Sequence, residues 1–222
     1  MNRLLTTCAC VAALTAPALA DTPREATVKT HPSQGEVVAV DDANANLLVH
    51  DEGFFVSLET DGLTPGHVHT LWLVVINDPA ACYDEAAVEA KQKAAAEDCN
   101  SRDVLLRTEE TQSDVGWAGG VIVGEDGHAR FALHQPEGEL SGAWFGGGLE
   151  EASTAEVHLV VNDHGPLIAG REREMLTSYG DGCKDDSIPG PMPATARADG
   201  LPGPNVCRLV QFAVFKLPKA ES

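Results

Sequence analysis

Four histidines, in two short stretches of the chain, have the residue type and spacing of transition-metal ligands. His67 and His69 lie one residue apart in GHVHTLWLVVIND, and His158 and His164 lie in AEVHLVVNDHGP. Residues i and i+2 of a strand point to the same face, so His67 and His69 could bind one ion together. If the two stretches form neighbouring strands, all four imidazoles could converge on copper or zinc, two ions that imidazole nitrogen binds well.

A second interpretation gives these histidines a structural role. A histidine at a strand end can donate one ring N–H to a backbone carbonyl and accept a hydrogen bond at the other nitrogen. Under this interpretation the protein is a non-catalytic binding or structural protein. Glu156 and Asp163 flank the histidines and could orient them as carboxylate partners, or could be ordinary surface residues. His50 is a weaker fifth candidate ligand.

Catalytic patterns are weak in this chain. Ser141, Ser153 and Ser178 lack the sequence context of a nucleophile elbow, so no catalytic residue is predicted. A metal-dependent redox enzyme that uses the same histidines is the third interpretation.

The elements that must position these residues are short strands. Residues 53–60 alternate apolar and polar side chains, as a half-buried strand does, whereas residues 67–76 are apolar on both faces. Residues 155–162 should turn Val157, Leu159 and Val161 inward. Further strands are expected at 208–217 and within 35–50.

Residues 120–133 read as a hairpin around Asp126-Gly127. Phe131 would then face the core, and His128 and His134 would lie on the surface. Many short strands with Gly and Pro turns, and no βαβ alternation, predict an all-β fold, an antiparallel Greek-key-like β-sandwich.

Four cysteines follow the first twenty residues: Cys82, Cys99, Cys183 and Cys207. We predict the disulfides Cys82–Cys99 and Cys183–Cys207, because each pair brackets one irregular insertion, and each should stabilise by about 3 kcal/mol. A cysteine metal site is the rival interpretation, but the chain has no CxxC motif. The Ala-, Glu- and Lys-rich residues 84–98 predict one short helix inside the first insertion.

The first twenty residues have the three parts of a secretory signal peptide: Arg3, an apolar run and the small residues Ala18-Leu19-Ala20. The Leu5-to-Cys8 stretch resembles a lipoprotein box, but it precedes any adequate apolar run. We therefore expect a signal peptide at 1–20, a flexible segment at 21–34 and one sandwich domain at 35–218. The protein should be exported, to the periplasm or the exterior, where disulfides persist.

The charge limits the classes of partner. The formal net charge is −19, which argues against binding nucleic acid or anionic membranes, since both require clustered Lys and Arg. After the signal, no apolar run reaches the roughly 18 residues that span a bilayer, so no membrane insertion is expected. The partners that remain are a metal ion, a protein or a glycan ligand.

Three stretches of the chain resemble a group of uncharacterised secreted bacterial proteins. These are GLTPGHVHTLWLVVINDPAAC, STAEVHLVVNDHGP and VCRLVQFAVFKL, and the resemblance covers most of residues 50–217. It implies that histidine is usual at the positions of His67, His158 and His164, and less so at His69. More distantly, LTPGHVH is similar to the strand that opens the metal site of copper/zinc superoxide dismutases and to chordin-type (CHRD) domains, which implies a β-sandwich. The further histidines and aspartate of a dismutase zinc site do not follow, because Cys82 and residues 84–98 come next.

Overall fold

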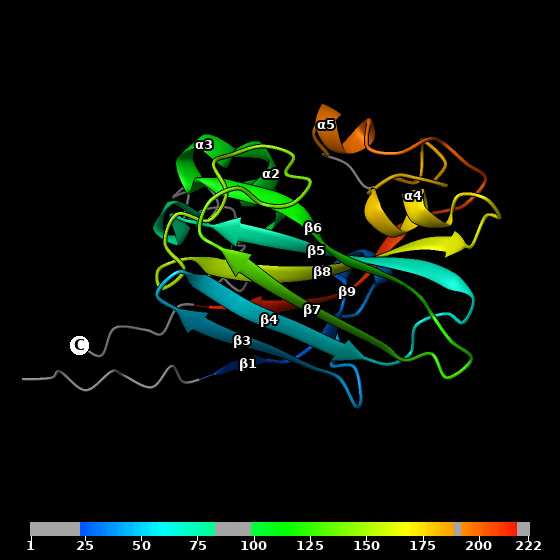
Figure 1. Ribbon diagram of the computed structural model, residues 1–222, viewed down its shortest axis with the longest axis horizontal. Coiled ribbons are helices and arrows are strands. Elements are labelled where there is room, and N and C mark those ends of the chain that lie inside the picture. The colour runs from blue at the N-terminus through cyan, green and yellow to red at the C-terminus, as the bar shows by residue number, and fades with distance from the viewer. Residues whose placement is uncertain (1–22, 83–98, 189–191, 217–222) are drawn as a thin grey trace, which may run out of the picture.

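Two antiparallel sheets stacked face to face form the protein, as a computed structural model shows (Figure 1). The structure describes residues 23–82, 99–188 and 192–216. The four-stranded sheet has the order β1-β3-β4-β7 and the five-stranded sheet the order β2-β9-β8-β5-β6. The strands of the first sheet are β1 (Arg24–Ala26), β3 (Asn44–His50), β4 (Gly53–Thr60) and β7 (Ala129–Pro136). Those of the second are β2 (Lys29–Thr30), β9 (Arg208–Phe215), β8 (Glu156–Pro166), β5 (His67–Ile76) and β6 (Ser113–Ile122). The predicted all-β sandwich is confirmed.

The main core lies between the two sheets and follows the two-residue period of the strands. Val157, Leu159 and Val161 of β8 are fully buried there, as predicted, and Leu71 and Leu73 of β5 lie beside them. The four-stranded sheet contributes Leu47, Phe54, Val56, Leu58 and Phe131. Alternate residues of β5 and β8 therefore point away from this core.

A second apolar cluster covers the other face of the five-stranded sheet. Trp72 and Val74 of β5 belong to it, together with Trp144 and Tyr179 from the connecting segments. Short helices lie over this face: α2 (Ser101–Leu106), α3 (Thr108–Thr111), α4 (Glu172–Thr177) and α5 (Ala194–Arg197) (Figure 1). Two 3-10 turns, η1 (Pro32–Gln34) and η2 (Pro79–Cys82), complete the described helices. Because both faces of β5 are covered, its sequence is apolar on both faces.

Both predicted disulfides are present. Cys82 bonds to Cys99 and Cys183 bonds to Cys207, with sequence separations of 17 and 24 residues. The second disulfide ties the long segment after α4 to the start of β9, so it holds part of the cover over the five-stranded sheet.

Three expectations differ from the structure or lie outside it. Residues 24–26 and 29–30, within the segment expected to be flexible, form strands paired with β3 and β9. The expected hairpin around Asp126-Gly127 was wrong, because β6 pairs with β5 in one sheet while β7 pairs with β4 in the other. The signal peptide at 1–20 and the helix at 84–98 lie outside the described residues.

Candidate functional site

The two histidine stretches are neighbours in the fold, as the metal hypothesis required. β5 and β8 pair antiparallel, and His69 stands directly opposite Asp163. His67 stands opposite Pro166, close to the end of the same ladder. The side chains of His67, His69 and Asp163 therefore meet at one end of the sandwich, on the face of the sheet that carries Leu71 and Val161.

Asp163 joins the two imidazoles of this group. Its Oδ1 atom lies 2.9 Å from Nδ1 of His67 and 3.8 Å from Nε2 of His69. The same oxygen accepts a 2.7 Å hydrogen bond from the backbone N–H of Gly165, which fixes the carboxylate in place. The centres of the two imidazole rings are 6.4 Å apart. A carboxylate in this position orients the His67 ring, as carboxylates do for many metal-binding histidines.

His69 is the buried member of the group, with 1 % of its surface exposed. Burial lowers the pKa of His69 to about 4, although the Asp163 charge acts in the opposite direction. The ring is therefore neutral near pH 7 and keeps one nitrogen lone pair free to accept. Its Nδ1 atom has no hydrogen-bond partner among the described residues, which is an uncommon state for a buried polar atom.

His164 points to the opposite face of the sheet and is held by a chain of hydrogen bonds. Trp72 donates to Thr70 Oγ1, and Thr70 Oγ1 lies 2.9 Å from Nε2 of His164. Nδ1 of His164 lies 3.1 Å from the carbonyl oxygen of Asp181, so this nitrogen must carry the proton and donate it. Both ring nitrogens are satisfied, which is the arrangement expected of a structural histidine. Burial lowers the pKa of this imidazole.

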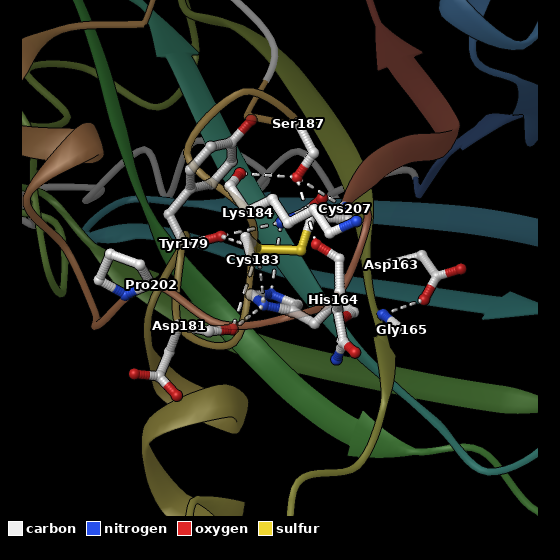
Figure 2. The surroundings of a disulfide bond; sticks show 12 residues. Asp163, His164, Gly165, Tyr179, Asp181, Cys183, Lys184, Ser187, Pro202 and Cys207 are labelled. Atoms are coloured by element: carbon white, nitrogen blue, oxygen red, sulfur yellow. Dashed lines mark hydrogen bonds between the residues drawn. A yellow bond between two sulfur atoms is a disulfide. The ribbon is translucent and has the colours of Figure 1, made fainter.

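The Cys183–Cys207 disulfide lies against His164, with Sγ of Cys183 3.8 Å from Nδ1 (Figure 2). The imidazole and the two sulfur atoms lie within 4.8 Å of one another. They do not make a metal site as they stand, because a disulfide sulfur is not a thiolate and the imidazole is fully hydrogen-bonded.

His158 lies apart from the other three histidines. It precedes His164 by six residues on the same strand, which at the rise of a β-strand is about 20 Å. Its Nε2 atom lies 2.6 Å from a carboxylate oxygen of Glu156. The structure therefore brings His67 and His69 together and separates both from His158 and His164, so one ion cannot contact all four.

A cavity lies on the outer face of β5 and β8, and its wall includes three aromatic side chains. Trp72 and Trp144 have ring centres 4.7 Å apart, and Tyr179 packs edge-on against both, at 5.2 and 4.7 Å. His158 and Met192 also line it. About 70 Å³ of this cavity can be reached by the centre of a water-sized molecule.

Two polar groups of these aromatic residues are buried without a partner. Nε1 of Trp144 and the hydroxyl of Tyr179 make no hydrogen bond with the described residues. Burial also raises the pKa of Tyr179, so its hydroxyl keeps its proton and remains a donor. Nothing in the sequence marks this cavity, because Trp72 lies in a strand that is apolar on both faces and the segments that hold Trp144 and Tyr179 lack periodicity.

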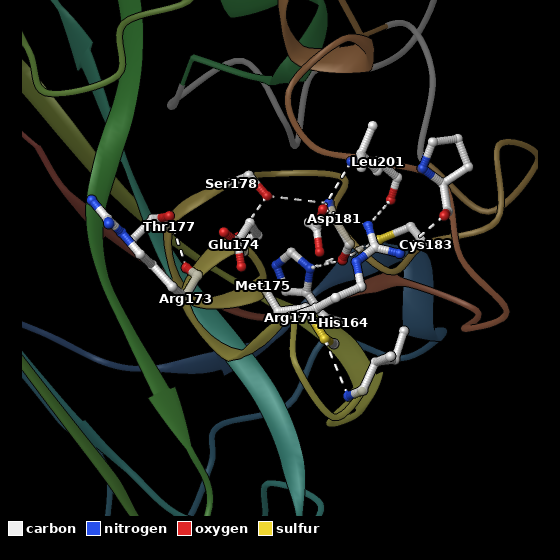
Figure 3. A network of polar contacts seen from close by, with 12 residues as sticks. His164, Arg171, Arg173, Glu174, Met175, Thr177, Ser178, Asp181, Cys183 and Leu201 are labelled. Atoms are coloured by element: carbon white, nitrogen blue, oxygen red, sulfur yellow. Dashed lines mark hydrogen bonds and ion pairs between the residues drawn. The ribbon is translucent and has the colours of Figure 1, made fainter.

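A polar network fastens the cover of this cavity to α4. Arg171, just before α4, contacts the Asp181 carboxylate and the carbonyl oxygens of Leu201 and Pro202 (Figure 3). Asp181 is 1 % exposed and also accepts the N–H of Leu201. The segment that carries Tyr179 and Cys183 is thus held by an ion pair and a disulfide.

Searches of known protein families, curated proteins and solved structures found no match to this chain. Among the described residues, no helix is long and apolar enough to cross a membrane.

Proposed function

We propose that this chain is an exported, non-catalytic binding protein whose aromatic cavity takes a small uncharged ligand. The observation that carries the proposal is the pair of buried donors without partners, Nε1 of Trp144 and the Tyr179 hydroxyl. A buried donor without a partner costs about 1–3 kcal/mol, and a ligand oxygen would recover that cost. The signal-like first twenty residues and the two disulfides support export.

The cavity wall defines the chemistry of the ligand. Indole and phenol faces favour a flat apolar surface, while two donors without partners favour acceptor oxygens on the ligand. The net charge of −19 disfavours an anion. A single sugar ring, or an aromatic ring with a carbonyl or ether oxygen, fits this description, and the small cavity excludes an extended chain.

Ligand binding can be followed through the tryptophan emission of the purified, disulfide-bonded protein. We expect at least one compound of a panel of monosaccharides and small aromatic ethers to shift this emission in a saturable way. Tyr179→Phe should weaken that binding about tenfold, since one hydrogen bond contributes about 1–1.5 kcal/mol. Trp117→Phe is the matched control, because Nε1 of Trp117 already donates to the carbonyl oxygen of Leu176. A flat titration with every compound, or equal affinity in Tyr179→Phe, would reject the proposal.

A second candidate function is metal binding at His67, His69 and Asp163, which the unpartnered Nδ1 of His69 favours. Two imidazoles and a carboxylate are a donor set that zinc and copper accept. Asp163 stands between the two rings, so the side chains would have to close further around an ion. The test is metal analysis of protein purified without chelators. His69→Leu should lose about one equivalent of zinc or copper, and His158→Leu should keep it; equal metal content in both variants rejects this site.

A further inference from the structure

Another pair of histidines lies on the exposed face of the four-stranded sheet, on the far side of the main core from the cavity. His50 ends β3 and His134 lies in β7, with β4 between them. Their Nε2 atoms are 3.1 Å apart. His134 is exposed and His50 is half-buried, so solvent and dissolved ions can reach the pair.

Packing holds the two rings in this position. Phe55 of β4 stacks on His134 with ring centres 4.4 Å apart and contacts His50 at 5.2 Å. The two imidazoles are themselves stacked, with ring centres 5.1 Å apart. Beside them, a side chain on Gly53 would lie 2.2 Å from the carbonyl oxygen of Gln135, so glycine lets β4 and β7 approach closely at this point. Ring stacking and the close approach of the strands therefore hold the two nitrogen atoms near each other.

The protonation of the pair follows from its neighbours. The backbone N–H of Glu52 donates to Nδ1 of His50 at 3.2 Å, so the proton of this neutral ring sits on Nε2. That proton points at Nε2 of His134, which must then offer its lone pair. One shared proton thus occupies the space between the two nitrogen atoms.

We propose that His50 and His134 bind one divalent transition-metal ion between their Nε2 atoms, with Cu²⁺ the preferred ion. Two nitrogen ligands at 2.0–2.1 Å from an ion lie about 2.8 Å apart at a right angle and about 3.4 Å apart at the tetrahedral angle, which brackets the observed 3.1 Å. When the ion enters, the Nε2 proton of His50 moves to Nδ1, so the ring stays neutral and gives up the Glu52 N–H bond. Water molecules complete the coordination of the ion. Cu²⁺ is preferred because it binds nitrogen ligands most strongly among the divalent first-row transition metals.

The electrostatic setting favours a cation. Asp51 and Glu52 form the turn that follows His50, and the whole chain is strongly acidic. The negative potential of these acidic residues raises the local concentration of cations, but it does not select a particular cation. The site is independent of the aromatic cavity and of His67, since those lie on the other sheet.

The test is a Cu²⁺ titration of the full, disulfide-bonded protein after chelator treatment and dialysis, at pH 7.5. Calorimetry counts the ions, and electron paramagnetic resonance counts the nitrogen atoms bound to each. We expect an ion with two bound nitrogens in the wild type, and His50→Ala and His134→Gln should each weaken its binding by about tenfold or more. His128→Ala, which removes a partly exposed histidine elsewhere, should leave the two-nitrogen spectrum unchanged.

Circular dichroism shows whether each variant is folded, and both substitutions are at positions open to solvent. His69→Leu removes the other candidate two-imidazole site, so it is combined with each variant for this comparison. A two-nitrogen spectrum that persists in His50→Ala/His69→Leu and His134→Gln/His69→Leu would place the copper elsewhere and overturn the proposal. So would a wild-type spectrum with a single bound nitrogen. Neither result bears on the aromatic cavity, which is tested by tryptophan emission.

Discussion

His69 and Asp163 face each other across β5 and β8, with Nε2 of His69 3.8 Å from Oδ1 of Asp163. This distance is too long for a hydrogen bond, so the carboxylate acts on His69 through its charge. Its hydrogen bonds go instead to Gly165 and His67. Asp163 therefore ties the end of β8 to the start of β5, whether or not an ion is bound.

The first prediction concerns this tie. Asp163→Asn should lower the free energy of unfolding by about 1–3 kcal/mol, because a neutral amide oxygen is a weaker acceptor than the carboxylate for the N–H groups of His67 and Gly165. Urea unfolding measures the change. Asp126→Asn is the control, since Asp126 also accepts the backbone N–H two residues ahead but is exposed to solvent. Equal, small losses of unfolding free energy in Asp163→Asn and Asp126→Asn would contradict the role of Asp163 in joining β8 to β5.

The second prediction is a pH dependence due to His31. Nδ1 of this ring accepts the N–H of Ser33, and the ring packs edge-on against Phe212. Burial lowers the pKa of His31 to about 4, from 6.5 in the unfolded chain. As the pH falls, His31 is protonated in the unfolded chain before it is protonated in the folded protein. Its contribution to stability is therefore complete above pH 6.5 and is lost as the pH falls towards 4.

A fully buried group with this shift would lose about 3 kcal/mol, but solvent screening of the half-buried ring reduces the loss to the order of 1 kcal/mol. Urea unfolding of wild type and His31→Gln at pH 7 and pH 4.5 gives the comparison. The wild type should lose more stability than the variant over this interval. Parallel losses would show that His31 does not cause the effect.

The third prediction concerns the contact between β6 and α4. A side chain on Gly120 would lie 2.1 Å from the carbonyl oxygen of Leu176, the same oxygen that accepts Nε1–H of Trp117. Gly120→Ala should therefore push α4 away and cost about 1–3 kcal/mol. Gly147→Ala is the control, because nothing lies within 4 Å of its added methyl group. Thermal unfolding should show a lowered midpoint for Gly120→Ala alone.

The fourth prediction concerns the Arg171–Asp181 ion pair. Asp181 is buried and Arg171 is about a quarter exposed, so Arg171→Met leaves a buried carboxylate without its cation and should cost about 3–5 kcal/mol. The double variant Arg171→Met/Asp181→Asn should recover part of this loss, since the charge is gone. Urea unfolding of the wild type, Arg171→Met, Asp181→Asn and the double variant forms the cycle. Additive losses would mean that the two side chains do not act together.

Much of the fold follows from periodicity in the sequence. The alternation in residues 53–60 and 155–162 correctly predicted strands and the inward face of β8. The disulfide pairing followed from where the irregular insertions lie. The Asp126-Gly127 turn led to the wrong prediction of a hairpin, because a turn sequence does not determine whether the two strands that it joins lie in the same sheet.

The candidate site was only partly predictable, for a geometric reason. Periodicity states which residues of one strand share a face, but it does not relate the faces of two strands. β5 is apolar on both sides, so nothing in its sequence marks His67 and His69 as core-side and opposite to His164. Likewise His50 and His134 could be paired only once the order β3-β4-β7 was known.

Asp163 and His164 are neighbours in strand β8, and their side chains point to opposite faces of the five-stranded sheet. Asp163 contacts His67, and His164 lies against the Cys183–Cys207 disulfide. A shift of the strand by one residue would exchange these two sides completely. A single-residue insertion between Val161 and Asp163 would therefore move the Asp163 carboxylate to the position of His164, against the disulfide, and leave another side chain between His67 and His69. A two-residue insertion preserves the alternation, so length changes in this strand should be accommodated in pairs.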